Sequence, residues 1–216
     1  MITAKINLEM LPRTMRDLPL DERGYPVPWF VDWLDGKPEF RAMDYRKFKR
    51  AIRERLCWVC GGKLGVNLCF VVGPMCGINR ISSEPPSHLL CARWSAENCP
   101  FLSNPHMVRR QDGLTEEVWD NVAGIGLKRN PGVTLLWITR EYEIIPDGNG
   151  KHLLMMGRPE SIEWWAEGRT ATRPEIFKSI ESGYPNLLAI AQTQEGAVAE
   201  LQKQRADFVE RYLPAV

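Results

Sequence analysis

Two pairs of side chains in this sequence have the types and spacing of metal ligands. Cys57 and Cys60 lie in the run CWVCGG, and His88 and Cys91 lie in PPSHLLCARW. Two residues separate the members of each pair, so both side chains of a pair can reach one ion. Thiolate sulfur and imidazole nitrogen are ligands that Zn²⁺ prefers, and four of them complete its tetrahedral coordination. The sequence therefore predicts one structural zinc site formed by Cys57, Cys60, His88 and Cys91.

Three further cysteines leave one ligand position open. Cys69 lies in an apolar run and is expected in the core, whereas Cys76 or Cys99 could replace His88 as the fourth ligand. These three offer no second pair at ligand spacing, so a second zinc site is not expected. The alternative is that the cysteines are ordinary small buried side chains. Because the chain lacks an N-terminal apolar targeting run, we expect reduced cysteines and a cytoplasmic location rather than disulfides.

The residues around the two pairs predict how the ligands are positioned. Gly61 and Gly62 allow the backbone to turn tightly after the first pair. Ser87 is a predicted helix N-cap, which would place His88 and Cys91 in the first helical turns. Since these two residues are three positions apart, they would share one face of that helix.

The segment between the pairs predicts a β-hairpin. We expect a strand at 64–72, a turn at Gly73-Pro74 and a returning strand at 75–81. A zinc knuckle, a hairpin and a ligand-bearing helix, in this order, make residues 55–102 resemble a treble-clef zinc finger. The resemblance implies a small metal-stabilised module within the chain.

Basic residues concentrate around this module. Residues 41–110 contain twelve Lys or Arg against four Asp or Glu, a balance of +8, whereas the whole chain carries +1. The densest run, DYRKFKRAIRER, predicts a helix from an Asp44 cap to about Leu56 with one apolar side. Such a helix beside a zinc module predicts a phosphate-contacting surface, with a merely solvated helix face as the alternative. The predicted binding residues are Arg46, Lys47, Lys49, Arg50, Arg53, Arg80 and Arg93.

Motifs of several catalytic classes are absent from the sequence. HNH-type nucleases carry a histidine on the hairpin of a treble clef, but the corresponding segment FVVGPMCGINR has none. Zinc deaminases pair HxE with PCxxC, and the chain contains neither. Phosphate-binding loops, GxGxxG and GxSxG are also missing. Four protein ligands leave no open position on the zinc ion, so enzymatic activity is disfavoured.

Two functions are compatible with these patterns. The first is a non-enzymatic, zinc-stabilised protein that binds nucleic acid or an acidic protein partner through the basic helix and the zinc module. The second is an enzyme or small-ligand-binding protein with a pocket between the hairpins and the zinc module, using Arg80, His106 and Arg109. No stretch of the sequence is long and apolar enough to span a membrane.

The rest of the chain predicts an α+β fold packed as one compact unit over residues 1–216. Residues 1–24 are an expected N-terminal arm, and Trp29–Leu34 with Glu39–Met43 form a first hairpin. Residues 130–216 are expected to contain a second hairpin followed by helices. Its two strands are predicted at 133–145 and 151–157, around the turn PDGNG.

Four further segments predict helices. The expected helices cover 159–168, 172–183 and 186–212, the last two separated by Gly183-Tyr184-Pro185, while 115–124 is a short helix or an ordered loop. Across the chain, the phrases GYPVPWF, RERLCWVCG, PPSHLLCARWSAENCPFL, KRNPGVTLLW and EGRTATR resemble a group of uncharacterised bacterial and phage-type proteins. That resemblance implies that the whole chain forms one unit.

Overall fold

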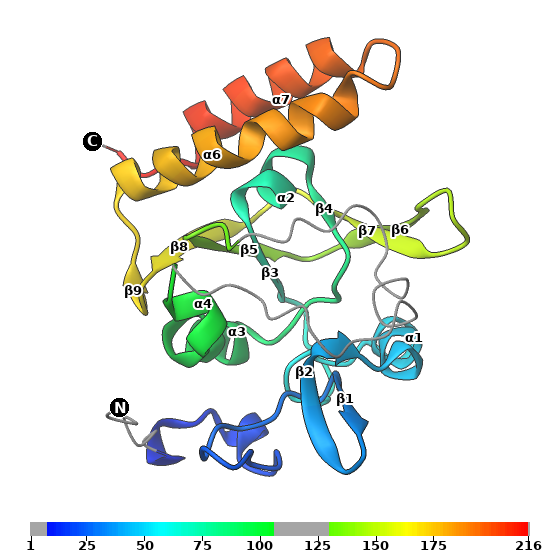
Figure 1. The fold of residues 1–216 in the computed structure, drawn as a ribbon, viewed down its shortest axis with the longest axis vertical. Helices are drawn as coiled ribbons and strands as arrows, with labels where there is room; N and C mark the ends of the chain where they lie inside the picture. The colour runs from blue at the N-terminus through cyan, green and yellow to red at the C-terminus, as the bar shows by residue number, and fades with distance from the viewer. Residues whose placement is uncertain (1–7, 106–129, 216) are drawn as a thin grey trace.

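The computed structural model describes residues 8–105 and 130–215 and has the mixed α+β architecture that the sequence predicts (Figure 1). Its helical elements are η1 (Leu8–Met10), η2 (Arg13–Met15), α1 (Tyr45–Glu54), α2 (Pro74–Asn79), α3 (Leu89–Asn98), α4 (Pro100–Ser103), α6 (Arg173–Ala191) and α7 (Ala197–Tyr212). Its strands are β1 (Val31–Leu34), β2 (Lys37–Met43), β3 (Leu68–Val72), β4 (Ile81–Ser82), β5 (Thr134–Thr139), β6 (Tyr142–Pro146), β7 (His152–Met156), β8 (Ser161–Ala166) and β9 (Arg169–Thr170).

The first hairpin and the basic helix form where the sequence predicts them. Asp35 and Gly36 join β1 to β2 with φ angles of 49° and 74°, the left-handed pair that suits a two-residue hairpin turn. Asp44 caps α1, since its side chain accepts a hydrogen bond from the Arg46 backbone N–H. The helix ends at Arg55, which takes a left-handed conformation with φ of 52°. These local signals therefore set the boundaries of both elements.

The main core lies around an antiparallel sheet in the order β3-β5-β8-β9. β5 is buried along its whole length because both faces of the sheet are covered. Leu135 and Trp137 pack in the cluster that includes Ile176 of α6 and Phe208 of α7. The intervening Leu136 packs in another cluster with α3 side chains. In Figure 1 the paired helices α6 and α7 cover one side of this sheet and α3 lies on the other.

A second sheet, in the order β4-β7-β6, contains the predicted PDGNG hairpin as β6 and β7. The prediction of one strand over 133–145 was wrong in its extent, because the chain breaks at Arg140-Glu141. β5 and β6 consequently belong to different sheets. Arg140 and Glu141 interrupt the apolar run at this point, but β-propensity on both sides of them favoured one continuous strand.

The segment 159–168 was wrongly predicted as a helix and contains β8. Ile162, Trp164 and Ala166 alternate with Glu163 and Trp165, which is the two-residue period of a strand. β8 pairs with β5 over its length and buries Trp164 and Ala166 in the main core. Pairing with β5 thus decides the conformation of this segment.

Two further helix boundaries differ from the prediction. The expected returning strand at 75–81 is helix α2, which begins with Pro74 in its first turn, a position that suits proline. The expected break at Gly183-Tyr184-Pro185 is absent, since α6 continues through Pro185 to Ala191. Burial of Ile176, Ile180 and Ala191 in the main core stabilises this helix despite the proline.

Of the segments considered from sequence, 115–124 falls outside the described residues, as do His106, Arg109 and Arg110. Within 8–105 and 130–215, the helices are too short or too polar to cross a lipid bilayer.

Candidate metal centre

The four predicted ligands come together in space. The sulfur atoms of Cys57, Cys60 and Cys91 and a ring nitrogen of His88 all lie within 4.8 Å of one another. Cys57 and Cys91 are fully buried, and none of the cysteines forms a disulfide. Three sulfurs and one imidazole converging on one point can bind a metal ion.

The first ligand pair is held by a tight backbone turn. The Cys57 N–H donates to the Gly62 carbonyl at 2.7 Å, and the Gly61 N–H donates to the Cys57 carbonyl at 2.8 Å. Gly61 has a φ of 72°, a conformation that favours glycine. The sequence expectation for this turn is confirmed at Gly61, whose positive φ redirects the chain so that Cys57 and Cys60 face the same point.

The second pair is positioned differently from the prediction. Ser87 is not the N-cap of α3: its backbone pairs with Cys69 through hydrogen bonds of 2.7 and 3.0 Å. His88 is the N-cap, with an extended backbone, and α3 begins at Leu89. Cys91 therefore lies in the first turn of the helix, and hydrogen bonds with Cys57 and Cys60 raise the pKa of its thiol above the ordinary value.

Contacts around the ligands orient them. The Nε2 atom of His88 lies 2.9 Å from the Lys63 carbonyl oxygen, so it carries the proton that this hydrogen bond needs. The other ring nitrogen, Nδ1, then faces the sulfurs of Cys60 and Cys91, at 3.4 and 3.8 Å. Lys63 thus fixes the tautomer in which Nδ1 can bind a metal ion.

The sulfur atoms have hydrogen-bond partners of their own. Cys57 Sγ accepts from the backbone N–H groups of Cys60 at 3.4 Å and His88 at 3.3 Å. Thr14 Oγ1 lies 3.2 Å from Cys91 Sγ, which joins the N-terminal arm to the cluster. Neither Thr14 nor Lys63 was identified from the sequence, because their roles depend on contacts between distant segments.

The ligands polarise one another electrostatically. Burial raises the pKa of the Cys57 thiol, but hydrogen bonds with Cys60, Cys91 and His88 outweigh burial and lower that pKa below its ordinary value. Hydrogen bonds with Cys57 and Cys60 raise the pKa of His88 to about 10. Cys57 is therefore the cysteine of the cluster most easily deprotonated. A bound metal ion would take the place of the protons that the ligands share in their hydrogen bonds.

The remaining cysteines lie outside this cluster. Cys69 is buried in β3, and burial raises the pKa of its thiol above the ordinary value. Burial also raises the pKa of Cys76, in α2, to about 11, while Cys99 follows the end of α3. Since the described cluster consists of Cys57, Cys60, His88 and Cys91, His88 is the fourth candidate ligand rather than Cys76 or Cys99.

Five of the seven predicted basic residues lie on α1. Arg46, Lys49, Arg50 and Arg53 recur at the spacing of one helix face and are exposed. Lys47 instead points toward the body, where its ammonium group donates to the Val31 carbonyl at 3.0 Å.

The other two predicted basic residues lie on separate elements. Arg80 follows the end of α2 and is exposed. Arg93, on α3, forms an ion pair with Glu163 of β8. The structure therefore brings the α1 residues together and provides no described contact that joins Arg80 or Arg93 to them.

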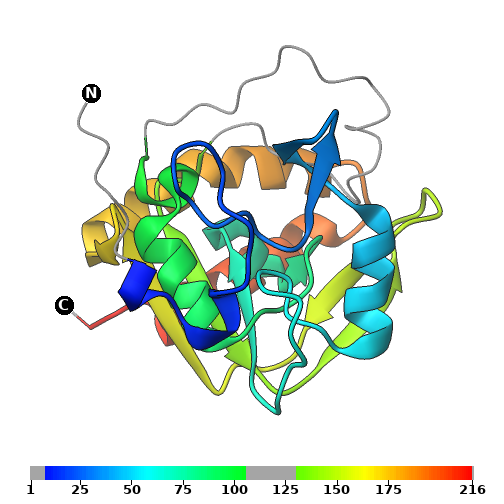
Figure 2. The ribbon, with the colours of Figure 1, turned by 90° about the horizontal axis from the view of Figure 1, so that it is seen from below.

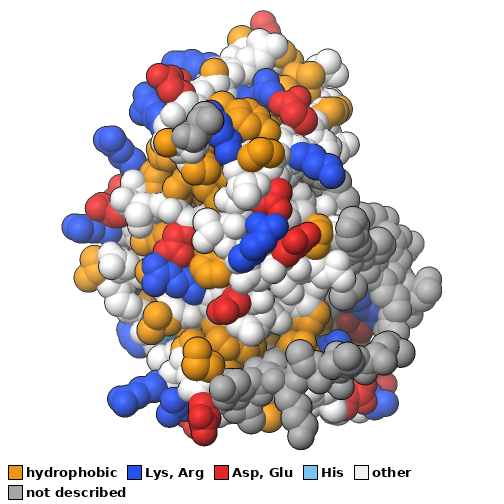
Figure 3. Space-filling view, turned by 90° about the vertical axis from the view of Figure 1, so that its left-hand side faces the viewer, with side chains coloured by type: hydrophobic (Ala, Val, Ile, Leu, Met, Phe, Trp, Pro, Cys, Tyr) orange, Lys and Arg blue, Asp and Glu red, His pale blue; other side chains and the backbone are white. Residues whose placement is uncertain are grey.

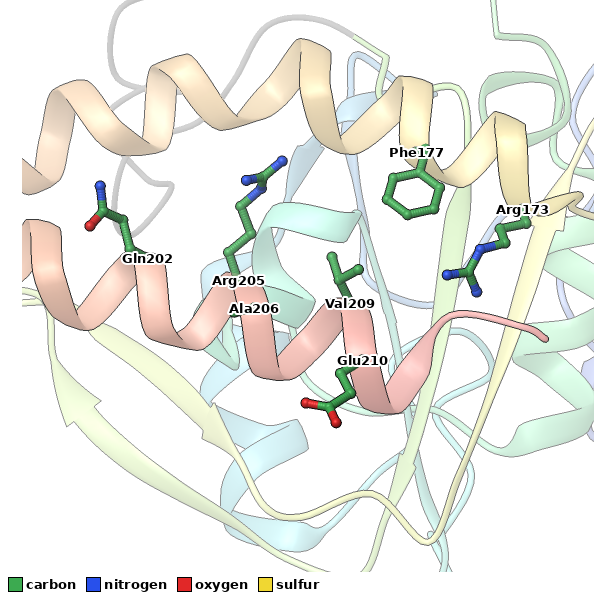
Figure 4. Close-up of a pocket in the computed structure, with 7 residues that line it drawn as sticks. All are labelled: Arg173, Phe177, Gln202, Arg205, Ala206, Val209 and Glu210. Atoms are coloured by element: carbon green, nitrogen blue, oxygen red, sulfur yellow. The ribbon is translucent and has the colours of Figure 1, made fainter. Parts of the chain in front are cut away.

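A hollow of about 580 Å³ lies between α6 and α7, away from the metal cluster (Figure 4). It is lined by Arg173, Phe177, Gln202, Arg205, Ala206, Val209 and Glu210. Its cations already have partners, since Arg173 bonds the Pro214 carbonyl and Arg205 pairs with Glu181. This hollow does not lie between the hairpins and the metal cluster, where the sequence alternative placed a pocket.

No protein-family model, curated protein or solved structure matches this chain. The resemblance to phage-type proteins receives no support from these comparisons. The treble-clef resemblance is limited to the ligand pairs and α3, because α2 occupies the place of the returning hairpin strand. The four-residue cluster is accordingly the firmest guide to function.

Proposed function

We propose that the cluster binds Zn²⁺ and that the ion is structural. For a tetrahedral zinc ion, with sulfur at roughly 2.3 Å and nitrogen at roughly 2.1 Å, a sulfur and a nitrogen ligand lie about 3.6 Å apart. The distances of 3.4 and 3.8 Å from His88 Nδ1 to the two sulfurs bracket that value. Cys57, Cys60, His88 and Cys91 would fill all four positions, which leaves none for a substrate.

The function that the geometry supports best is binding of a nucleic-acid backbone through α1. Arg46 has 89 % of its side chain exposed, Arg53 70 % and Arg50 52 %. Asp44 pairs with Arg46 and Glu54 pairs with both Arg50 and Arg53, so these two carboxylates offset only part of the positive charge on α1. The exposed basic residues on one face of α1 carry this proposal, and we call them the cationic stripe: Arg46, Lys49, Arg50 and Arg53. Phosphates are attracted to such a row of positive charges whatever the base sequence.

The metal centre and α1 are joined by direct contacts. Lys63, whose carbonyl bonds His88, also donates from its ammonium group to the Glu54 carbonyl at the end of α1, at 2.6 Å. We call the turn at residues 57–62 the knuckle. Trp29 lies against it, since a Cβ at Gly61 would be 2.7 Å from the Trp29 ring. The guanidinium carbon of Arg50 lies 5.7 Å from the centre of that ring. Metal binding would therefore stabilise the position of the cationic stripe.

By contrast, the face opposite α1 has no such concentration of one charge. Figure 3 shows Lys and Arg side chains interspersed with Asp and Glu on that side of the molecule. Figure 2, seen from below, places the knuckle between α1 and α3. The proposed binding surface is thus confined to the α1 side of the metal centre.

The test is fluorescence anisotropy with labelled nucleic acid and the zinc-loaded full chain. Four phosphate contacts predict that affinity falls roughly 50- to 150-fold between 50 and 200 mM salt. The double variant Arg50→Glu with Arg53→Glu should weaken binding at least about tenfold and flatten the salt dependence. Arg211→Glu, at an exposed position of α7, is the control and should have little effect.

Two outcomes would contradict the nucleic-acid proposal. One is affinity that does not change with salt. The other is displacement of the nucleic acid by polyglutamate at equal charge concentration, which would favour an acidic protein as the partner. Metal analysis of the same preparation tests the zinc proposal separately, since absence of stoichiometric zinc contradicts it whatever the binding result.

A further inference from the structure

The β1–β2 hairpin carries exposed aromatic side chains beside the basic helix. Its strands pair with each other in a two-stranded sheet of their own, and the hairpin projects from the body (Figure 1). Trp33 is 41 % exposed and Phe40 is 38 % exposed. Large aromatic side chains usually bury their rings, so two exposed rings on one projecting hairpin indicate a contact surface.

The two rings lie on the same face of the hairpin. Trp33 is opposite Pro38 in the ladder, so their side chains point the same way. Glu39 and Arg41 pair with each other and therefore share the other face. Phe40, between them, points to the face of Pro38. Trp33 and Phe40 therefore share one face of the hairpin, with the register shift on the Phe40 side of the Trp33–Pro38 pair.

Cationic groups adjoin this aromatic face. The Arg23 guanidinium carbon lies 5.8 Å from the centre of the Phe40 ring, and 48 % of its side chain is exposed. Asp21 holds that guanidinium in place through hydrogen bonds of 2.8 and 2.9 Å. At the base of the hairpin, Lys47 of α1 bonds the Val31 carbonyl. The hairpin and α1 are therefore joined by a direct contact at the base of the hairpin.

The turn and the ladder position Trp33 on the hairpin. Asp35 and Gly36 both have positive φ, so the turn matches the right-handed twist of the strands. The register shift lies between Val31 and Asp32 on β1, and on β2 it leaves residues 40–42, including Phe40, without ladder partners. Trp33 is therefore held next to the turn by its pairing with Pro38, which lowers the entropy cost of binding at that ring.

We infer that this face stacks the bases of single-stranded nucleic acid, while Arg23 and the α1 cations hold its phosphates. The inference rests on the proposed function and specifies its ligand. In a duplex the bases stack on one another and offer no free face, whereas an unpaired strand offers its bases to aromatic rings. Trp33 and Phe40 supply two such rings next to cations, which is the combination found in single-strand binding proteins.

The experiment compares a labelled oligothymidylate with a duplex of equal length, using the zinc-loaded full chain. Wild type should bind the single strand more tightly. Trp33→Ala and Phe40→Ala should each weaken single-strand binding about 5- to 100-fold and leave duplex binding unchanged. Trp33→Phe should restore most of the affinity. Leu34→Ala is the matched control, since Leu34 is 43 % exposed on the opposite face of the same hairpin.

The outcomes separate this inference from the proposed function. If Trp33→Ala and Phe40→Ala bind like wild type, or if Leu34→Ala loses as much affinity, base stacking on this face is wrong. If the α1 double variant still weakens binding in that case, the phosphate-binding function stands. If Trp33→Ala instead dissociates a dimer in sedimentation without changing single-strand affinity, the face is a self-association surface. Absence of any binding by wild type overturns both.

Discussion

The metal-binding region and the main sheet bury apolar side chains in different ways. Around the metal centre, the buried cluster is small and irregular. It combines cysteines with side chains from the N-terminal arm, the segment 57–64, the first residue of β3 and α3: Leu11, Met15, Cys57, Val59, Leu64, Leu68, Cys91 and Trp94. The main core contains aromatic and aliphatic side chains from β3, β5, β7, β8, α6 and α7. Short segments without a continuous sheet bury too little apolar surface for high stability, so we expect the first region to depend on its metal ion and the second on packing.

Loss of the metal should produce the largest effect, and only in the metal-binding region. Structural zinc sites contribute an apparent binding free energy of about 10–16 kcal/mol in zinc-finger peptides. Cys91→Ser should therefore abolish stoichiometric zinc and expose the amides of the knuckle to hydrogen exchange. Amides of β5 should stay protected, because both faces of that strand are covered.

The control for this variant is Cys99→Ser, at a cysteine outside the cluster. It should retain one zinc ion per chain by elemental analysis. If Cys91→Ser keeps its zinc, or if β5 loses protection together with the knuckle, the proposed division between the two regions is wrong.

Truncation in the main core should have the next largest effect. Trp137 is fully buried, and its indole N–H donates to the Gly157 carbonyl at 2.9 Å. Trp137→Ala should lower the free energy of unfolding by about 3–5 kcal/mol in urea denaturation. Zinc content should be unchanged. Loss of zinc from the folded variant would mean that the two regions are not independent.

A matched pair of glycines sharpens the comparison further. A Cβ at Gly77 would lie 2.6 Å from Leu135 and 2.7 Å from Phe208, so Gly77→Ala should cost about 1–3 kcal/mol of stability. In Gly61→Ala the added Cβ would clash with the Trp29 ring, and the backbone φ of 72° would be strained. This variant should therefore lower zinc affinity as well as stability. Gly65→Ala meets open space and is the neutral control. Competition with a zinc chelator measures the affinities; equal zinc affinity in the Gly61 and Gly77 variants would contradict the expectation.

The smallest effect is expected at the start of α6. The hydrogen bonds from Arg169 and then from Thr172 lower the pKa of Glu175 to about 2. A lowered folded-state pKa contributes stability above the unfolded value of 4.5, and this contribution is lost as the pH falls toward 2. Glu175→Gln should therefore cost about 0.5–1 kcal/mol at neutral pH, since the carboxylate lies near the surface.

Acid titration of the thermal midpoint checks this expectation. The difference between Glu175→Gln and wild type should shrink between pH 4.5 and 2. Thr172→Ser, which keeps a hydroxyl at the capping position, is the control and should follow wild type. A constant difference across that range would show that the capping carboxylate is not the cause.

Local signals in the sequence were sufficient where a few neighbouring residues decide the conformation. The ligand spacing and the Asp44 cap gave a correct site and a correct helix start, and the first hairpin forms with β2 beginning two residues earlier than predicted. The signals failed where distant pairing decides. The segment of β8 has a two-residue period, but its acidic and aromatic residues also suit a capped helix. Pairing with β5, which is distant in the sequence, makes it a strand.

The contacts that support the metal ligands could not be predicted from the sequence, because they also join distant segments. Thr14 reaches Cys91 from the N-terminal arm, 77 positions away along the chain. Lys63 acts through its backbone carbonyl, a group that every residue has, so its identity carries no signal. Conversely, the α1 cations were predictable as a set because helical periodicity places them on one face.

The two ligand pairs also flank the segment that contains β3, α2 and β4, with Cys60 and His88 28 positions apart. An ion that joins these pairs closes that segment into a loop, whereas β3 and β5 are separated by a much longer stretch of chain. Loop closure costs conformational entropy, and a closed loop leaves fewer arrangements to search. We expect refolding to be faster in the presence of zinc, because β3 would then pair with β5 as part of a loop that the ion has already closed.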